Sequence, residues 1–254
     1  MTTGELYDFI DAFAPFGSAM DFDNPGLLVG ERNTSVQTVL FSLDITSEVV
    51  TEGKNIGAQL IVSHHPVIFN ALKQLRTSSA PYLLAQYGID AICAHTNLDM
   101  APGGVNTVLA QRLQLKNVRT LSEYAPNLPE ALMGELQEPL APLPFAQQVK
   151  QQLHCDGLRY TDGKRLVKTV GLCSGGGTDL LYTAAAAGCE GFVTGESKHN
   201  LLLDAEQLQL TLIDAGHFET EDIVMEPLMQ KVKEAFPKLY CIKSKVMHSP
   251  AHYI

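Results

Sequence analysis

The stretch TVLFSLDITSEVVTEGKNIGAQLIVSHHP, residues 38–66, predicts a strand, a helix and a second strand in direct succession. Residues 38–46 and 58–66 are apolar runs of the kind that form buried strands. Between them, residues 47–57 have a helical pattern that ends at a glycine. Apolar strands that alternate with short helices indicate layered α/β structure, in which helices cover the sheets.

The same order of elements occurs a second time along the chain. The first stretch continues with a helix and a strand, and residues 168–221 repeat the order strand, helix, strand, helix, strand. We therefore predict two similar α/β lobes with mixed sheets covered by helices, residues 1–115 and 129–254, joined by a linker at residues 116–128. The pattern leaves open whether the lobes share one sheet.

The composition excludes several classes of protein. The chain has 254 residues, of which 45% are hydrophobic and 18% charged, as in ordinary globular proteins. The net charge of −10 argues against nucleic acid as the main partner. The five cysteines are scattered and odd in number, which indicates thiols in a reducing compartment. The start has no signal-peptide pattern and no run is apolar enough to cross a membrane, so we expect a cytoplasmic protein.

Polar side chains collect where the predicted strands end, in the segments SHHP, HTNLD, TGESKH and GHFETE. Open α/β sheets bind ligands beyond the carboxyl ends of their strands. These four segments can therefore share one cleft, and we place the candidate site in the cleft between the two lobes.

Two adjacent histidines, His64 and His65, pose a geometric problem. Successive side chains of a strand point to opposite faces, so the two rings cannot converge on one small target while the chain stays extended. Either the strand ends there or the histidines serve two targets. Pro66 favours an end, because proline donates no ladder hydrogen bond and biases the preceding residue.

Three further side chains complete a candidate metal site: Asp99 in the loop that ends the predicted strand-to-loop segment at residues 90–99, and His217 and Glu221, whose spacing of four stacks them on one helical face. Taken singly, these residues are equally explained as surface or turn groups. Together with His64 and His65 they exceed the ligand set of one tetrahedral ion. Carboxylates can bridge ions, and this mixture suits Zn, Fe, Mn, Co or Ni.

Other polar groups receive simpler interpretations. Glu219 falls on another helical face from Glu221 and is interpreted as an outer or surface group. His95 either orients a ligand or substrate or is a structural histidine. The segment SGGGTD, residues 174–179, is more typical of a tight strand-to-helix turn than of a phosphate loop. The remaining histidines are interpreted as surface or terminal residues, and the role of the last two is open: His154, His199, His248 and His252.

The segments DNPGLLVG, SLDIT, IVSHHPVIF, AHTNLDMAPGGVN, TGESKHN and GHFETE together resemble the NIF-three-like dinuclear-metal-centre hexameric proteins, also labelled GTP cyclohydrolase I type 2 homologues. The resemblance implies two α/β domains, a homo-hexameric ring and two divalent ions per subunit. It places the metal ligands of that family on residues that are all present here: His64, His65, Asp99, His217 and Glu221.

These features leave two classes of function open. A pair of divalent ions can activate water, which favours a metal-dependent hydrolase of a nucleotide or related small molecule, and the label of the family suggests ring opening of GTP. The alternative is a non-catalytic metal-binding hexameric protein with a regulatory or interaction role. No catalytic residue beyond the ligands is assigned, His95 being the one weak candidate for a general acid. The substrate and the metal cannot be determined from the sequence.

Overall fold

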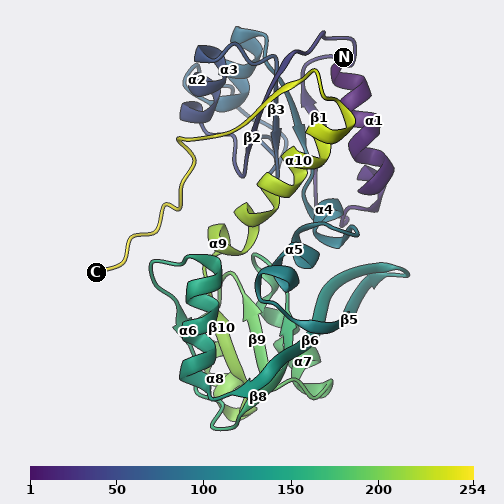
Figure 1. Cartoon of the computed structure of the whole chain (residues 1–254). Coiled ribbons are helices and arrows are strands. Elements are labelled where there is room, and N and C mark those ends of the chain that lie inside the picture. Colours follow the sequence, from purple (N-terminus) through teal and green to yellow (C-terminus); the bar gives the residue numbers. More distant parts are fainter. The chain divides into compact units, whose positions relative to one another are not determined.

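The computed structural model describes residues 1–254 and consists of two compact units, shown in Figure 1. Unit 1 contains Met1–Leu98 and Val224–His248, and unit 2 contains Asp99–Ile223 and Ser249–Ile254. Unit 2 is thus inserted into the sequence of unit 1. The insertion begins inside one short helix, α4 (Thr96–Met100), and ends inside the 3₁₀ helix η3 (Asp222–Val224).

Unit 1 contains a five-stranded mixed sheet in the order β1-β4-β3-β2-β11. Strands β2, β3, β4 and β11 run parallel, and β1 pairs antiparallel with β4. The elements are α1 (Thr3–Phe13), η1 (Phe16–Ser18), β1 (Gly26–Val29), β2 (Thr38–Ser42), α2 (Ser47–Asn55), β3 (Leu60–Ser63), α3 (Ala80–Tyr87), β4 (Asp90–Cys93), α10 (Met225–Ala235) and β11 (Tyr240–Lys243).

Helices cover both faces of the unit 1 sheet. Leu40 and Ile61 of the sheet pack in one cluster with Val49 of α2 and Leu84 of α3. Their strand neighbours point to the opposite face, because side chains alternate along a strand. Figure 1 shows α2 and α3 on one side of this sheet and α10 on the other. The result is three layers, whose strands are buried on both faces as their apolar sequences require.

Unit 2 contains a six-stranded mixed sheet in the order β5-β6-β8-β9-β10-β7. Strands β8, β9 and β10 run parallel, whereas the other three pair antiparallel with their neighbours. The elements are α5 (Val105–Arg112), β5 (Lys116–Ala125), β6 (Leu128–Leu140), α6 (Pro142–Leu153), β7 (Arg159–Tyr160), β8 (Val167–Leu172), η2 (Gly177–Leu180), α7 (Leu181–Ala186), β9 (Gly191–Thr194), α8 (His199–Gln207), β10 (Thr211–Asp214) and α9 (His217–Glu221).

Two hydrophobic clusters lie on the two faces of the unit 2 sheet. Val193 of β9 packs with α5 and α6, and its neighbour Phe192 packs with α7 and α8. Ile213 and Leu212 of β10 are divided in the same way. This alternation shows that the sheet is covered on both faces, as predicted for an α/β lobe.

The predicted repeat is confirmed. The order strand, helix, strand, helix, strand forms β2-α2-β3-α3-β4 in unit 1 and β8-α7-β9-α8-β10 in unit 2. In each unit the three strands are neighbours and parallel, so the fold is mixed α/β with two separate sheets.

The division of the chain differs from the predicted boundaries. Residues 116–128, expected to be a linker, contain β5, which pairs with β6 in the unit 2 sheet. The strand is largely exposed and has no apolar face to reveal it in the sequence. In addition, residues 224–248 belong to unit 1, because β11 pairs with β2.

No helix is both long and apolar enough to span a bilayer. None of the five cysteines is in a disulfide, and four of them are buried.

Candidate metal centre

The end of β3 explains how two adjacent histidines can share one side of the chain. The backbone amides of His64 and His65 both donate to the carbonyl oxygen of Leu43, at 3.1 and 3.0 Å. Consecutive amides of an extended strand point in opposite directions, so this shared acceptor marks a turn at the strand end. The two rings consequently lie with their centroids 5.1 Å apart.

A third imidazole joins them within unit 1. β3 and β4 are paired so that Ser63 lies opposite Cys93, and the chain places His95 just beyond that point. The ring centroid of His95 lies 5.1 Å from that of His64 and 5.4 Å from that of His65. One ligand nitrogen from each ring lies within 4.8 Å of the others, a group that can hold a metal ion.

Each of these rings is held by an oxygen acceptor at Nδ1. The acceptors are the carbonyl oxygen of Ala94 for His64, Asp44 for His65 and Asp23 for His95, at 2.8, 2.8 and 2.7 Å. Metal-binding histidines commonly have such a partner, which fixes the tautomer and the orientation of the ring.

The Asp23 side chain is fully buried and accepts hydrogen bonds from two residues, His95 and Thr96. Burial alone would raise its pKa, but hydrogen bonds from the His95 ring and from the hydroxyl and amide of Thr96 outweigh that effect and lower it to about 2. Asp23 is therefore a permanent anion at neutral pH, and it accepts three hydrogen bonds.

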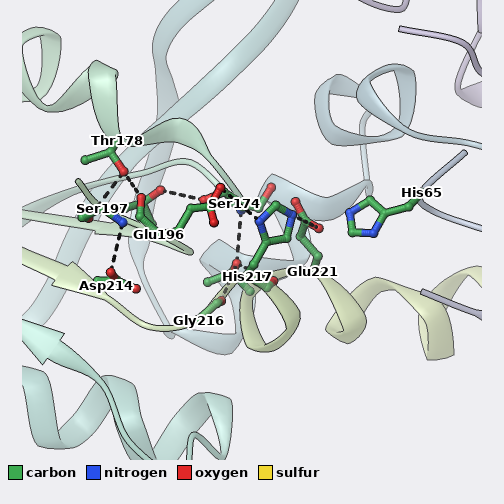
Figure 2. A network of polar contacts seen from close by, with 12 residues as sticks. His65, Ser174, Thr178, Glu196, Ser197, Asp214, Gly216, His217 and Glu221 are labelled. Carbon is green, nitrogen blue, oxygen red and sulfur yellow. Dashed lines mark hydrogen bonds and ion pairs between the residues drawn. The ribbon is translucent and has the colours of Figure 1, made fainter. Parts of the chain in front are cut away.

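Unit 2 presents a second group of donors, at the start of helix α9. His217 and Glu221 lie one turn apart on this helix, with His217 Nε2 3.0 Å from Glu221 Oε2, and Figure 2 shows the two side chains next to each other. A carboxylate oxygen of Asp99 lies within 4.8 Å of one from Glu221. Ser174 Oγ lies 3.5 Å from Asp99 Oδ1. An imidazole and two carboxylates thus lie close together.

Glycines make room for this group. Gly175 has φ +56°, and a Cβ there would lie 2.1 Å from Glu221 Oε1 and 3.2 Å from His217 Nε2. Gly195 is also crowded, because its Cβ would lie 2.7 Å from Thr220 Oγ1. The segment SGGGTD is therefore a tight turn into η2, as predicted, and its backbone packs directly against the side chains of α9.

Glu196 connects this group to a cavity of about 440 Å³. Its Oε1 lies 3.6 Å from His217 Nδ1, and it also lines the cavity. Figure 2 shows Glu196 between His217 and the residues Thr178 and Ser197. The remaining lining includes two cationic side chains, Arg159 and Lys198, of which Arg159 is paired with Asp214.

The predicted ligands are divided between the units: His64 and His65 belong to unit 1, and Asp99, His217 and Glu221 to unit 2. Asp99 lies in helix α4 rather than in the predicted loop. No pattern in the sequence assigned a role at the site to Asp23, Asp44 or Gly175; Asp44 lies two residues after the end of β2, inside the predicted strand at residues 38–46.

The donor chemistry of both groups fits divalent metal ions. Neutral imidazoles with outer oxygen partners and clustered carboxylates suit borderline transition metals.

The four histidines that the sequence analysis interpreted as surface or terminal residues are exposed: His154, His199, His248 and His252.

Comparisons with known proteins agree with this fold. The pattern of the family described as Duf34/NIF3 (NGG1p interacting factor 3) matches residues 1–250. The chain is 30% identical over 263 residues to a GTP cyclohydrolase 1 type 2 homolog of Clostridium perfringens, with 100% of both chains covered. It is also 30% identical over 238 residues to a protein of the same description from Campylobacter jejuni, with 92% of each covered. A solved structure of a Staphylococcus aureus hypothetical protein is 28% identical and has a TM-score of 0.93, over 100% of this chain and 99% of that one. The chain therefore belongs to the Duf34/NIF3 family.

Proposed function

We propose that this protein is a divalent-metal-dependent hydrolase with a dinuclear centre. Its ligands are His64, His65, Asp99, His217 and Glu221. The observation that carries the proposal is the donor set of unit 2, in which His217, Glu221 and Asp99 lie close together beside a polar cavity of about 440 Å³. Bridging carboxylates beside a concave polar site are typical of hydrolytic metal centres.

The course of the chain supports joining the donors of the two units. It passes from unit 1 to unit 2 between Leu98 and Asp99, and returns between Ile223 and Val224. Asp99 is thus the first residue after one crossing, and Glu221 lies three residues before the other. Both carboxylates therefore lie within three residues of a point at which the chain crosses between the units.

The residues of the chain have separable roles in this proposal. When bound, a pair of divalent ions lowers the pKa of a shared water and polarises the bond under attack. Asp44 and the carbonyl of Ala94 orient the two imidazoles, which would hold different ions through Nε2. Asp99 and Glu221 would hold the ions through their carboxylates. Glu196 orients His217 through Nδ1.

The proposed substrate is a nucleotide or a related small molecule. The cavity beside Glu196 has a volume within the range of small-molecule sites. Lys198 and the hydroxyl of Ser197 offer donors to anionic oxygens. The relatives described as GTP cyclohydrolase 1 type 2 homologs make a purine nucleotide the first substrate to test.

The test is a screen of the purified, metal-loaded chain against nucleotides, phosphoesters and amides, with the metal content measured in parallel. We expect turnover that Glu221→Ala reduces at least 100-fold, because removal of a bridging ligand disrupts the water-activating pair. His199→Ala, an exposed histidine of α8, is the control and should keep full activity. Turnover by metal-free protein, or by Glu221→Ala at the wild-type rate, would rule the proposal out.

A second function is favoured by the family description, which refers to an interacting factor. In that case the ions stabilise a homo-hexamer that binds a protein partner, and no turnover occurs. We propose the hexamer for both functions. Light scattering after size-exclusion chromatography should give about six times the chain mass of 27.6 kDa. Loss of the assembly on metal removal, without activity on any substrate class, would favour the second function.

We also propose that the protein is cytoplasmic, in keeping with its cysteine thiols.

A further inference from the structure

We propose that Phe22 and Phe69 form an aromatic platform on which a planar heteroaromatic ring, the purine base of a nucleotide, stacks. The platform belongs to unit 1 and lies beside the histidine cluster of that unit, which consists of His64, His65 and His95. The inference rests on the proposed function and deepens it. It assigns the base of the substrate to unit 1, whereas the donors proposed for its anionic oxygens belong to unit 2.

The two phenyl rings are in contact with each other, yet both are left largely uncovered. Their centroids are 6.3 Å apart at an interplanar angle of 45°, within the range of paired aromatic side chains. Phe22 is 64% exposed and Phe69 is 43% exposed. Phenylalanine side chains normally pack in cores and interfaces, so two uncovered rings in contact indicate a surface that receives a ligand.

The turn that carries Phe22 is held at both ends by one threonine. The amide of Asp23 donates to the carbonyl oxygen of Met20 at 2.9 Å, which closes the turn. The amide of Met20 donates to Thr96 Oγ1 at 2.9 Å, and that hydroxyl donates to Asp23 Oδ2 at 2.6 Å. Phe22 is therefore exposed on an anchored turn, which reduces the conformational entropy that is lost when a ring packs on it.

A hydrogen bond joins this turn to the segment that carries Phe69. Asn24 Nδ2 donates to the carbonyl oxygen of Ile68 at 2.6 Å. Asn24 follows Phe22 by two residues, and Ile68 directly precedes Phe69. The two rings are consequently held near each other by a link between their own segments, as a preorganised binding surface requires.

The platform is in ring contact with the histidine cluster. The centroid of the Phe69 ring lies 6.3 Å from that of His95, at an interplanar angle of 79°. The His95 ring in turn lies 5.1 Å from that of His64 and 5.4 Å from that of His65. A planar ring that packs on Phe69 would therefore lie beside two of the proposed metal ligands, which brings the base of a nucleotide close to the proposed centre.

The exposed area favours a small planar ring over a protein partner. The exposed fractions of the two phenylalanines together correspond to about one whole side chain, or roughly 150–250 Å². A stable protein interface buries about 800 Å² on each partner. Stacking of a base requires only the face of an aromatic ring, and every base has such a face to offer.

The test separates the base from the phosphate. Titration calorimetry of the full-length, metal-loaded chain compares guanosine monophosphate (GMP) with ribose 5-phosphate, which has the same sugar phosphate and no base. We expect GMP to bind roughly 5- to 150-fold more tightly, the range that stacking on an aromatic side chain gives. The double variant Phe22→Leu, Phe69→Leu keeps apolar side chains without ring faces and should remove this preference. Phe22→Tyr, Phe69→Tyr should retain it.

Leu75→Ala is the matched control. Leu75 is 56% exposed in the same loop as Phe69 and has no aromatic ring, so this variant should keep the preference for GMP. The preference should also persist in excess chelator, because neither phenylalanine is a proposed metal ligand. In the otherwise unmodified chain, ¹³C-labelled ring signals of Phe22 and Phe69 should shift with GMP and stay in place with ribose 5-phosphate, a readout that does not depend on the folding of any variant.

Three results would overturn the inference. They are the absence of a preference for GMP in the wild-type chain, a preference that survives the double leucine variant, and a smaller assembly of that variant in size-exclusion chromatography, which would show that a second copy of the chain covers the rings. The proposed function fails separately, when the metal-loaded wild-type chain prefers GMP to ribose 5-phosphate but turns over no substrate.

Discussion

At the scale of single residues, the most constrained position near the carboxylate donors is one that has no side chain. Gly175 combines a left-handed backbone with contact to Glu221, and its amide donates to Thr220 Oγ1 at 3.2 Å. A Cβ at this position meets the end of the Glu221 side chain, which can move only by leaving its place beside His217. Gly175 therefore sets the position of a proposed ligand.

Gly175→Ala should consequently weaken metal binding as well as stability. We expect a loss of about 1–3 kcal/mol from the positive φ and at least tenfold weaker metal binding from the displaced carboxylate. Gly188→Ala is the matched control, because Gly188 has φ +83° and its Cβ would have nothing within 4 Å. Urea unfolding and calorimetric metal titration should show a similar stability loss in both variants and an affinity loss in Gly175→Ala alone. Equal affinities would show that Glu221 adapts.

The buried cysteines give a pH-dependent prediction. Burial raises the pKa of Cys189 to about 11 and that of Cys155 to about 12. A raised thiol pKa contributes stability that is complete below the unfolded value of about 8.5 and is lost as the pH rises through the folded value. The free energy of unfolding should therefore fall between about pH 9 and pH 11.

Urea titrations at several pH values measure this effect, and the double variant Cys155→Ala, Cys189→Ala should show a shallower alkaline decline. At pH 8 about one thiol in a thousand is ionised when the pKa is about 11. Cys189 should thus react slowly with a disulfide reagent in the native chain and rapidly in denaturant. Fast reaction of native Cys189 would contradict the burial described here.

At the scale of elements, the turn between β4 and α4 organises the histidine group. Thr96 Oγ1 donates to Asp23 Oδ2 at 2.6 Å and accepts from the amide of Met20 at 2.9 Å. One hydroxyl thus connects the segment that carries His95 with the segment that carries its carboxylate partner.

Thr96→Val keeps the shape of the side chain and removes both hydrogen bonds. Because Asp23 is buried and charged, we expect a loss of about 1–3 kcal/mol in the free energy of unfolding. Thr51→Val is the control, since Thr51 is exposed and its hydroxyl bonds only within α2, to Ser47. Urea unfolding compares the two variants, and an equally small effect in both would show that Asp23 finds another donor.

The sequence predicted those elements whose pattern is local. The strands β2, β3, β4, β8, β9 and β10 are apolar runs, and the helices between them end at glycines or polar residues, so periodicity was sufficient to identify them. The exposed β5 and the late addition of β11 to the first sheet could not be predicted, because neither is encoded in a local apolar pattern.

The residues of the candidate site also divide into those that a local sequence pattern predicts and those that it does not. The sequence predicts the candidate donors His64, His65, Asp99, His217 and Glu221 as polar groups near strand ends, but not the side chains that hydrogen-bond to them. Asp23 lies 72 residues before His95 and reaches it only through tertiary structure. Such a partner has no spacing signature, so no sequence pattern distinguishes it from a surface aspartate.

At the scale of the whole molecule, metal binding should stabilise the chain as a whole. An ion that binds only the folded state adds about 2.7 kcal/mol at a concentration of one hundred times its dissociation constant. For a chain of this size that corresponds to a rise in Tm of roughly 5–10 °C. Thermal unfolding with Co²⁺ or Zn²⁺ and then with excess chelator should show the rise and its reversal. Glu221→Ala should show a smaller rise, and an unchanged Tm in the wild type would exclude tight binding.

The insertion of unit 2 into unit 1 also has a consequence for the order in which a newly made chain becomes functional. β11 pairs in register with β2, with Tyr240 opposite Thr38, so the first sheet can close only after all the strands of the unit 2 sheet have been synthesised. The sheet of unit 2 is complete by Asp214 and can form earlier. The sheet of unit 2 can therefore form before the sheet of unit 1, whose strand β3 leads to the candidate ligands His64 and His65, is closed.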